Sequence, residues 1–135
     1  LSRVSRVVQE YLGLRHDYGV IDCIELIRLF YKQELNINFP LPTYPKSKEW
    51  MKHFSTESVD QWASSCSIKV KLTDAQNYDV MAFKSTKSNL IIHFGLFLAP
   101  TRMLHIEEGG VSHVETLSDY WVKQIHSLYR HEKMV

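Results

Sequence analysis

The sequence LIIHFGLFLAPTRMLHI, residues 90–106, decides the fold because it holds two apolar runs separated by a short turn. Both runs have the aliphatic and aromatic content of buried strands. The stretch therefore predicts a β-hairpin, with Ala99-Pro100-Thr101 as a three-residue loop. Gly95, in the first strand, would allow another group to approach the backbone closely.

The loop length fixes which side chains share a face of this hairpin. With three loop residues, Leu98 pairs with Arg102, and His93 and His105 become diagonal neighbours within side-chain reach. A loop of two or four residues would turn His105 to the opposite face. The pairing of the two histidines therefore depends on the register.

The periodicity of the rest of the chain predicts helices first and strands afterwards. Residues 2–12 have the spacing of an amphipathic helix, and Asp22 with Glu25 forms a capping box that opens a second helix ending near Glu34. Weaker helical patterns surround Trp50 and residues 59–62, and the three prolines within residues 39–45 predict an extended loop. Further strands are predicted at residues 68–72, 78–83, 111–115 and 124–129, with a helical turn at residues 119–122. This order predicts a single α+β domain, residues 1–135, with N-terminal helices packed on a mostly antiparallel, five- to six-stranded sheet.

Composition excludes several classes of protein. The chain has 135 residues, with 16 basic and 15 acidic side chains and a formal charge of +1. That balance gives no strong field for a nucleic-acid backbone, and no apolar run is long enough to enter and cross a membrane. The sequence has no CxxC or HExxH motif and no glycine-rich phosphate loop, so we predict no metal site and no cofactor.

Cys23 is the candidate nucleophile. It follows the capping Asp22, so its thiol would lie at the positive end of the helix, where thiolate is favoured. That end contributes about 0.3–1 kcal/mol, which is less than the 1.36 kcal/mol needed for each pKa unit, and Asp22 and Glu25 oppose ionisation. A cationic imidazole nearby is therefore required, and the alternative is a buried structural cysteine. Cys66 is predicted to be a partly buried spectator.

His93 and His105 would supply that imidazole. One ring would form an ion pair with the thiolate and later protonate the leaving amine, while the second would hold the tautomer and orientation of the first. A satisfied core histidine is the alternative for either ring taken alone. The remaining histidines are predicted to be surface or loop residues: His16, His53, His113, His126 and His131.

These residues resemble the NlpC/P60 family of papain-like cysteine peptidases. The resemblance runs from about residue 11 to residue 130, and its details are most similar to the short versions found in the tail tips of bacteriophages and gene-transfer agents. It rests on four segments: Asp22-Cys23, Asp79-Val80, His93-Phe94-Gly95-Leu96-Phe97-Leu98 and Met103-Leu104-His105.

The resemblance implies a site and an activity. Cys23 would be the nucleophile, His93 the general base and acid, and His105 the orienting third residue. Tyr18, with Tyr11 as the alternative, would help to stabilise the oxyanion. The implied function is hydrolysis of peptidoglycan stem peptides, between D-glutamate and diaminopimelate, by a virion protein of the phage tail tip that acts in the cell wall and binds other tail-tip or hub proteins.

Two departures from the family pattern support a second interpretation. Ile24-Glu25 replaces the usual Ser-Gly after the cysteine, and Tyr78 replaces the glycine before Asp79. The alternative function is a catalytically lapsed structural subunit of a tail tip or baseplate. Four aromatic residues are candidate contacts with partner proteins in that case, and the alternative for each is a place in the core or at its rim: Trp50, Phe54, Trp62 and Trp121.

Overall fold

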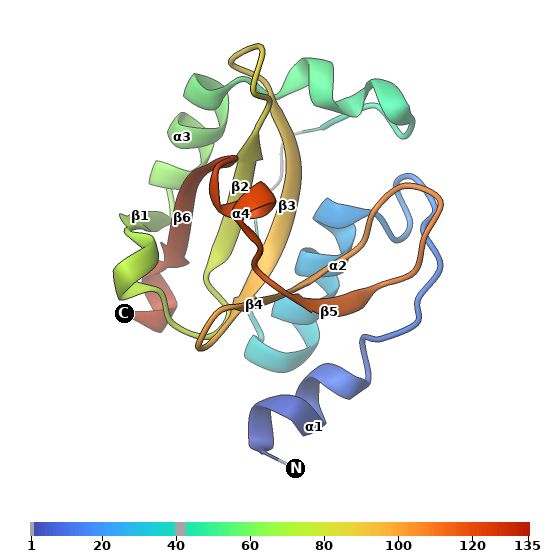
Figure 1. Ribbon diagram of the computed structural model, residues 1–135, viewed down its shortest axis with the longest axis vertical. Helices are drawn as coiled ribbons and strands as arrows, with labels where there is room; N and C mark the ends of the chain where they lie inside the picture. Colours follow the sequence, from blue (N-terminus) through green and yellow to red (C-terminus); the bar gives the residue numbers. More distant parts are fainter. Residues whose placement is uncertain (1, 40–42) are drawn as a thin grey trace.

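The computed structural model describes residues 2–39 and 43–135 (Figure 1). The α-helices are α1 (Arg3–Gln9), α2 (Cys23–Phe30), α3 (Thr56–Ser64) and α4 (Asp119–Val122). Shorter helical segments are the π-helical η1 (Tyr31–Leu35) and the 3₁₀ segments η2 (Lys48–His53), η3 (Leu72–Asp74) and η4 (Glu132–Met134). The strands are β1 (Ser67–Val70), β2 (Val80–Lys84), β3 (Ile91–Leu98), β4 (Arg102–His105), β5 (His113–Thr116) and β6 (Ile125–His131).

The six strands form one open sheet in the order β1-β6-β2-β3-β4-β5, and every neighbouring pair is antiparallel. The prediction of an α+β fold with a six-stranded antiparallel sheet is confirmed. The first helix is shorter than predicted, because α1 ends at Gln9. Part of the predicted proline loop, residues 40–42, lies outside the described residues.

Helix α2 positions the start of the site. Its Cys23, Leu26, Ile27 and Phe30 are all buried, as their spacing predicts, and the helix packs against β3. Asp22 caps it, and its Oδ1 accepts hydrogen bonds from the backbone N–H groups of Ile24 and Glu25. The predicted capping box forms only in part, because the Glu25 carboxylate accepts instead from Tyr44 and Arg28.

The β3–β4 hairpin has the predicted register. Leu98 pairs with Arg102 and Leu96 with Leu104, so the three-residue loop is confirmed. A Cβ atom at Gly95 would lie 3.0 Å from Met103 Sδ and 3.7 Å from His105 Cβ. Glycine at this position therefore lets the second strand and its histidine lie close to the first.

The sheet buries both faces. One face, with Phe94, Leu96 and Leu104, joins the main core that includes α2, and the other carries a smaller cluster that includes Phe83, Met103 and Trp121. A β-bulge opposite Phe83 and Lys84 changes the alternation before His93, so that Ile91 joins the main core. His93 faces the smaller cluster, as does Phe97 four residues later in β3. In Figure 1, α4 lies across β2 and β3 on this side.

Burial corrects two expectations for individual residues. His131 is buried in β6 rather than at the surface, because its ring packs against Phe39. Trp50, Phe54 and Trp121 are buried, so of the alternatives for these residues the structure shows the core position rather than an exposed partner surface. Among the described helices, none has the length and apolar character required to span a bilayer.

Candidate active site

Cys23 and His93 line one pocket of about 170 Å³. Cys23 is the first residue of α2, and His93 lies in the neighbouring strand β3 beside Phe94. The remaining lining comes from the loop before α2, from η2, from β3, from the β4–β5 connection and from α4: His16, Tyr18, Trp50, Met51, Ile92, Ile106, Glu107, Glu108, Tyr120 and Trp121. The two cysteines are not joined, since both Cys23 and Cys66 are free thiols.

The structure brings His93 and His105 together. Nε2 of His93 lies 2.8 Å from Nδ1 of His105, and both side chains are buried. Nε2 of His105 lies 2.5 Å from Oε1 of Glu115, which comes from β5. A chain of three side chains therefore runs from the edge of the sheet to the pocket.

The carboxylate at the end of this chain determines where the ring protons lie. A carboxylate only accepts, so neutral His105 must donate its Nε2–H to Glu115 and present a lone pair at Nδ1. That lone pair accepts the Nε2–H of His93, so Nδ1 of His93 also carries a lone pair. Nδ1 is thus the basic atom of His93 that remains for the pocket.

Aromatic packing holds the two imidazoles in place. The Trp121 ring is tilted by 31° to that of His93, at 5.1 Å between centroids, and meets His105 edge-on at 5.3 Å. Phe83 packs on His93 at 5.7 Å. These contacts restrict both rings to one orientation each, which a positioned base requires.

Electrostatics favour a neutral thiol and neutral imidazoles. Burial raises the pKa of the Cys23 thiol, and Asp22 raises it further, although backbone N–H groups including that of Phe94 lower it. Burial, with smaller contributions from His105 and His113, lowers the pKa of His93 to about 3. Burial also lowers the pKa of His105, although Glu115 opposes this shift. Burial therefore opposes both charges of the expected thiolate–imidazolium pair in the resting site.

The structure separates the two candidate oxyanion tyrosines. Tyr18 lines the pocket, and burial together with Glu108 raises its pKa to about 12, so its hydroxyl stays protonated. The Tyr11 hydroxyl donates to Glu34 at 2.6 Å, and this buried ring packs against Phe30 away from the pocket. Of these two tyrosines, Tyr18 is therefore the one that lies at the pocket with Cys23.

The unusual Ile24-Glu25 pair does not fill the pocket. Ile24 is buried in the main core. The Glu25 carboxylate lies 3.0 Å from the Tyr44 hydroxyl and 3.1 Å from Arg28 Nη1, which hold it away from the pocket lining. The space beside Cys23 is therefore retained despite both replacements.

Three site residues escaped the sequence analysis. Glu115 accepts a hydrogen bond from His105, and Trp121 packs on both imidazole rings. His113 lies in β5, partly exposed, with its ring 4.6 Å from that of His105. The alternation of His113 and Glu115 in a predicted strand was the available signal. It could not be used without the pairing of β5 with β4.

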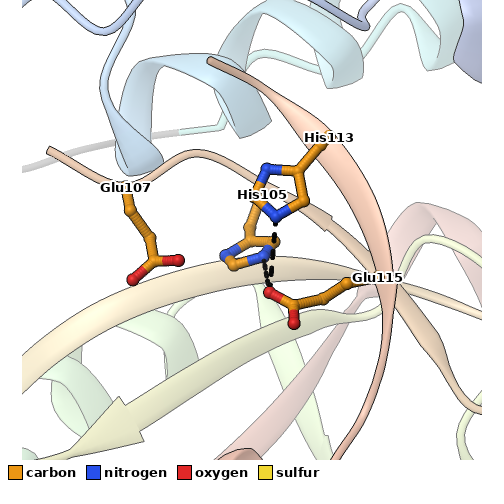
Figure 2. A group of neighbouring side chains, drawn as sticks. All are labelled: His105, Glu107, His113 and Glu115. Carbon is orange, nitrogen blue, oxygen red and sulfur yellow. Dashed lines mark hydrogen bonds and ion pairs between the residues drawn. The ribbon is translucent and has the colours of Figure 1, made fainter. Parts of the chain in front are cut away.

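Four side chains in this region could hold a metal ion. His105, Glu107, His113 and Glu115 each offer one ligand atom, and these atoms lie within 4.8 Å of one another. Figure 2 shows both imidazoles directed at the Glu115 carboxylate, with Glu107 on the other side of the His105 ring in this view.

Comparison with known proteins identifies relatives of the chain. It is 27% identical over 128 residues to tail tip assembly protein K of Escherichia phage lambda. The aligned region covers 93% of this chain and 61% of that protein. The chain thus spans less than two thirds of that relative's length.

Two solved structures share the fold. One is an NLP/P60-family protein of Staphylococcus aureus that is similar to a lipoprotein, with a TM-score of 0.59 and 19% identity over 95% of this chain and 40% of that chain. The other is RipD of Mycobacterium tuberculosis, described as a non-catalytic NlpC/p60 domain protein adapted to peptidoglycan binding, with a TM-score of 0.55 and 14% identity over 98% and 99% of the two chains. Residues 10–130 match the sequence model of the NlpC/P60 family. The chain belongs to the NlpC/P60 family.

Proposed function

We propose that this protein is a cysteine peptidase or amidase that hydrolyses peptidoglycan stem peptides from a phage tail tip. One observation carries the proposal. Cys23, the first residue of α2, lines the same pocket as His93, and Nε2 of His93 is hydrogen-bonded to Nδ1 of His105. A thiol, a base and a group that orients the base are the parts that nucleophilic acyl transfer needs.

The neutral resting pair defines the first step. Nδ1 of His93 removes the thiol proton as the Cys23 sulfur attacks the peptide carbonyl, because neither group is charged beforehand. Hydrogen bonds between such groups are often long in free enzymes and tighten in the substrate complex. The positive charge that develops on His93 is stabilised through His105 by Glu115.

The later steps use the same residues. The backbone N–H of Cys23 and the Tyr18 hydroxyl donate to the oxyanion. The imidazolium of His93 then protonates the leaving amine, which leaves a thioester on Cys23. Water, deprotonated by His93, attacks the thioester, releases the carboxylic acid and restores the thiol.

The comparisons support the substrate and the setting. The phage relative is a tail tip assembly protein, which supports a place in a virion tail beside other tail-tip or hub proteins. RipD is described as adapted to peptidoglycan binding, which supports a cell-wall peptide as the ligand of this fold. Local cleavage of the wall would open a path for DNA delivery.

A single substitution tests the proposal. Cys23→Ala is expected to reduce hydrolysis of purified Gram-negative peptidoglycan by at least about 10³-fold, because no other thiol lines the pocket. Its unfolding free energy should stay within about 1 kcal/mol of the parent, since the change is small. Cys66→Ala is the matched control, because Cys66 is also a buried free thiol but lies outside the pocket. If the Cys23 variant digests the wall at the parental rate, this mechanism is wrong.

The second candidate function is a non-catalytic tail-tip subunit that binds peptidoglycan. The observation that favours it is the raised pKa of Cys23, which is only 5% exposed, together with the non-catalytic assignment of RipD. Sedimentation of the protein with purified sacculi, without release of any muropeptide by parent or Cys23→Ala, would select this function.

A further inference from the structure

We propose that His105, Glu107, His113 and Glu115 form a zinc site behind the histidine chain, and that zinc bound there switches off the thiol chemistry. The binding step stands by itself, whereas the inhibition rests on the proposed function. The geometry comes from two His-x-Glu segments, residues 105–107 and 113–115, carried by the neighbouring strands β4 and β5 and the start of their connection.

Strand pairing places the ligands on one face. His105 and His113 are direct partners across the antiparallel pair, so their side chains are neighbours. Alternate residues of a strand point to the same side, which places Glu115 with His113. Each His-x-Glu segment thus directs an imidazole and a carboxylate toward the same region.

The distances suit a tetrahedral ion after small side-chain rotations. Zinc bonds of about 2.0–2.2 Å place tetrahedral ligand atoms about 3.3–3.6 Å apart. Here Glu115 Oε1 lies 2.5 Å from His105 Nε2 and 3.4 Å from His113 Nε2, and all four ligand atoms lie within 4.8 Å. Because Glu107 is exposed and His113 and Glu115 are partly exposed, their side chains can adjust.

A second observation points to a cation between His113 and Glu115. The Nδ1–H of His113 donates to the Val111 carbonyl at 3.0 Å, which leaves a lone pair at Nε2. That lone pair faces a carboxylate oxygen, and two acceptors attract each other only with a proton or a metal ion between them. A carbonyl bonded to the far nitrogen is also the usual support of a metal-binding histidine.

The ligand chemistry selects the metal. Two imidazoles with two carboxylates suit zinc, whereas magnesium and calcium prefer sites built from oxygen alone. The two carboxylates neutralise the charge of a divalent ion. Glu107 is exposed and lines the Cys23 pocket, so one ligand of the site is in contact with solvent.

Zinc at this site would reverse the ring protons of the histidine chain. With the metal on Nε2 of His105, the ring proton must move to Nδ1 and donate to Nε2 of His93. The proton of His93 then moves to Nδ1, which faces the pocket as a donor. No proton is gained or lost, but His93 can no longer take the proton of the Cys23 thiol.

Titration of the chelator-treated full chain tests the binding. Zinc in a calorimeter should bind at one ion per chain, and cobalt should give the visible absorption of a tetrahedral site. His113→Ala is expected to weaken zinc binding at least about tenfold, and His113→Ala with Glu107→Gln to remove the cobalt spectrum. His53→Ala and Glu10→Gln are matched controls, because both residues are exposed and lie outside the cluster.

Two further measurements separate this site from the thiol. Cys23→Ala should retain the parental zinc affinity, and ¹⁵N chemical shifts of His93 should show its proton moving from Nε2 to Nδ1 as zinc is added. In the hydrolysis assay, each variant is compared with its own zinc-free rate: zinc should lower the rate of the parent, whereas the same concentration should leave the rate of His113→Ala unchanged. Zinc binding that is lost in Cys23→Ala but kept in His113→Ala would overturn the proposal, as would the absence of saturable binding. A chain that binds zinc at the cluster but hydrolyses nothing would refute the proposed function and leave the metal site standing.

Discussion

At the scale of single residues, Glu115 determines where the protons of the two histidine rings lie. It lies outside the lining of the Cys23 pocket, yet its hydrogen bond to His105 determines which nitrogen of His93 is basic. In the proposed mechanism, Glu115 therefore acts on the base His93 through His105, without touching the substrate. We describe Glu115 as a positioning residue for this reason.

Glu115→Gln tests that role. We expect kcat for wall hydrolysis to fall by about 10²-fold with KM nearly unchanged, because the amide is isosteric but has lost the charge that stabilises the histidine chain. Glu132→Gln, an exposed change elsewhere, serves as the control. A rise in KM with kcat preserved would instead place Glu115 in substrate binding.

At the scale of an element, the start of α2 has two opposite effects on Cys23: it positions the thiol at the pocket, and it disfavours the thiolate. Asp22 is buried and accepts from Ile24, Glu25, Gly19 and Tyr44, so it fixes the helix start that presents Cys23. The same carboxylate raises the pKa of the adjacent thiol. The helix cap therefore opposes the thiolate that the helix end favours.

Asp22→Asn should separate these two effects. The amide oxygen can keep the cap, while loss of the charge is expected to lower the pKa of Cys23, so alkylation by iodoacetamide should begin at lower pH. The lost acceptor for Gly19 or Tyr44 should cost about 1–2 kcal/mol of unfolding free energy. The measurement is the pH dependence of alkylation in a Cys66→Ala background, with Glu49→Gln as the control. A midpoint that stays or rises would show that Asp22 does not set the pKa of the thiol.

At the scale of the whole molecule, a buried ion pair ties the last strand to the loop before β2. Arg130 of β6 donates to both carboxylate oxygens of Asp79 at 2.9 and 2.8 Å, and the Asp79 side chain is 0% exposed. The Gln76 N–H also donates to this carboxylate. The pair holds β6 beside β2, in the centre of the sheet that carries His93.

Arg130→Ala is expected to lower the unfolding free energy by about 3–5 kcal/mol, because it leaves a carboxylate buried without its partner. Lys69→Ala is the matched control, since its ion pair with Asp60 is largely exposed and should contribute no more than about 1 kcal/mol. Urea denaturation of both variants measures the contrast. Equal losses would mean that burial does not distinguish the two pairs.

The sequence alone determined the features that depend on near neighbours in the chain. The cap at Asp22, the buried face of α2, the strand segments and the register that brings His93 to His105 follow from spacing, alternation and a loop of fixed length. These rules concern residues that are close together in the chain, so the local sequence contains all the information that they need. That residues 1–135 form a single domain stays a prediction.

Only the tertiary structure decided which groups complete the site and how they are charged. Glu115 and Trp121 reach the two histidines through the pairing of β5 and the placement of α4, and the bulge at Ile92 turns Ile91 into the main core. Burial by the whole fold is the largest cause of the raised pKa of the thiol and of the lowered pKa of the imidazoles, so it favours their neutral forms. These properties depend on contacts between segments that are distant in the sequence, because every segment packed around the site helps to exclude water from it.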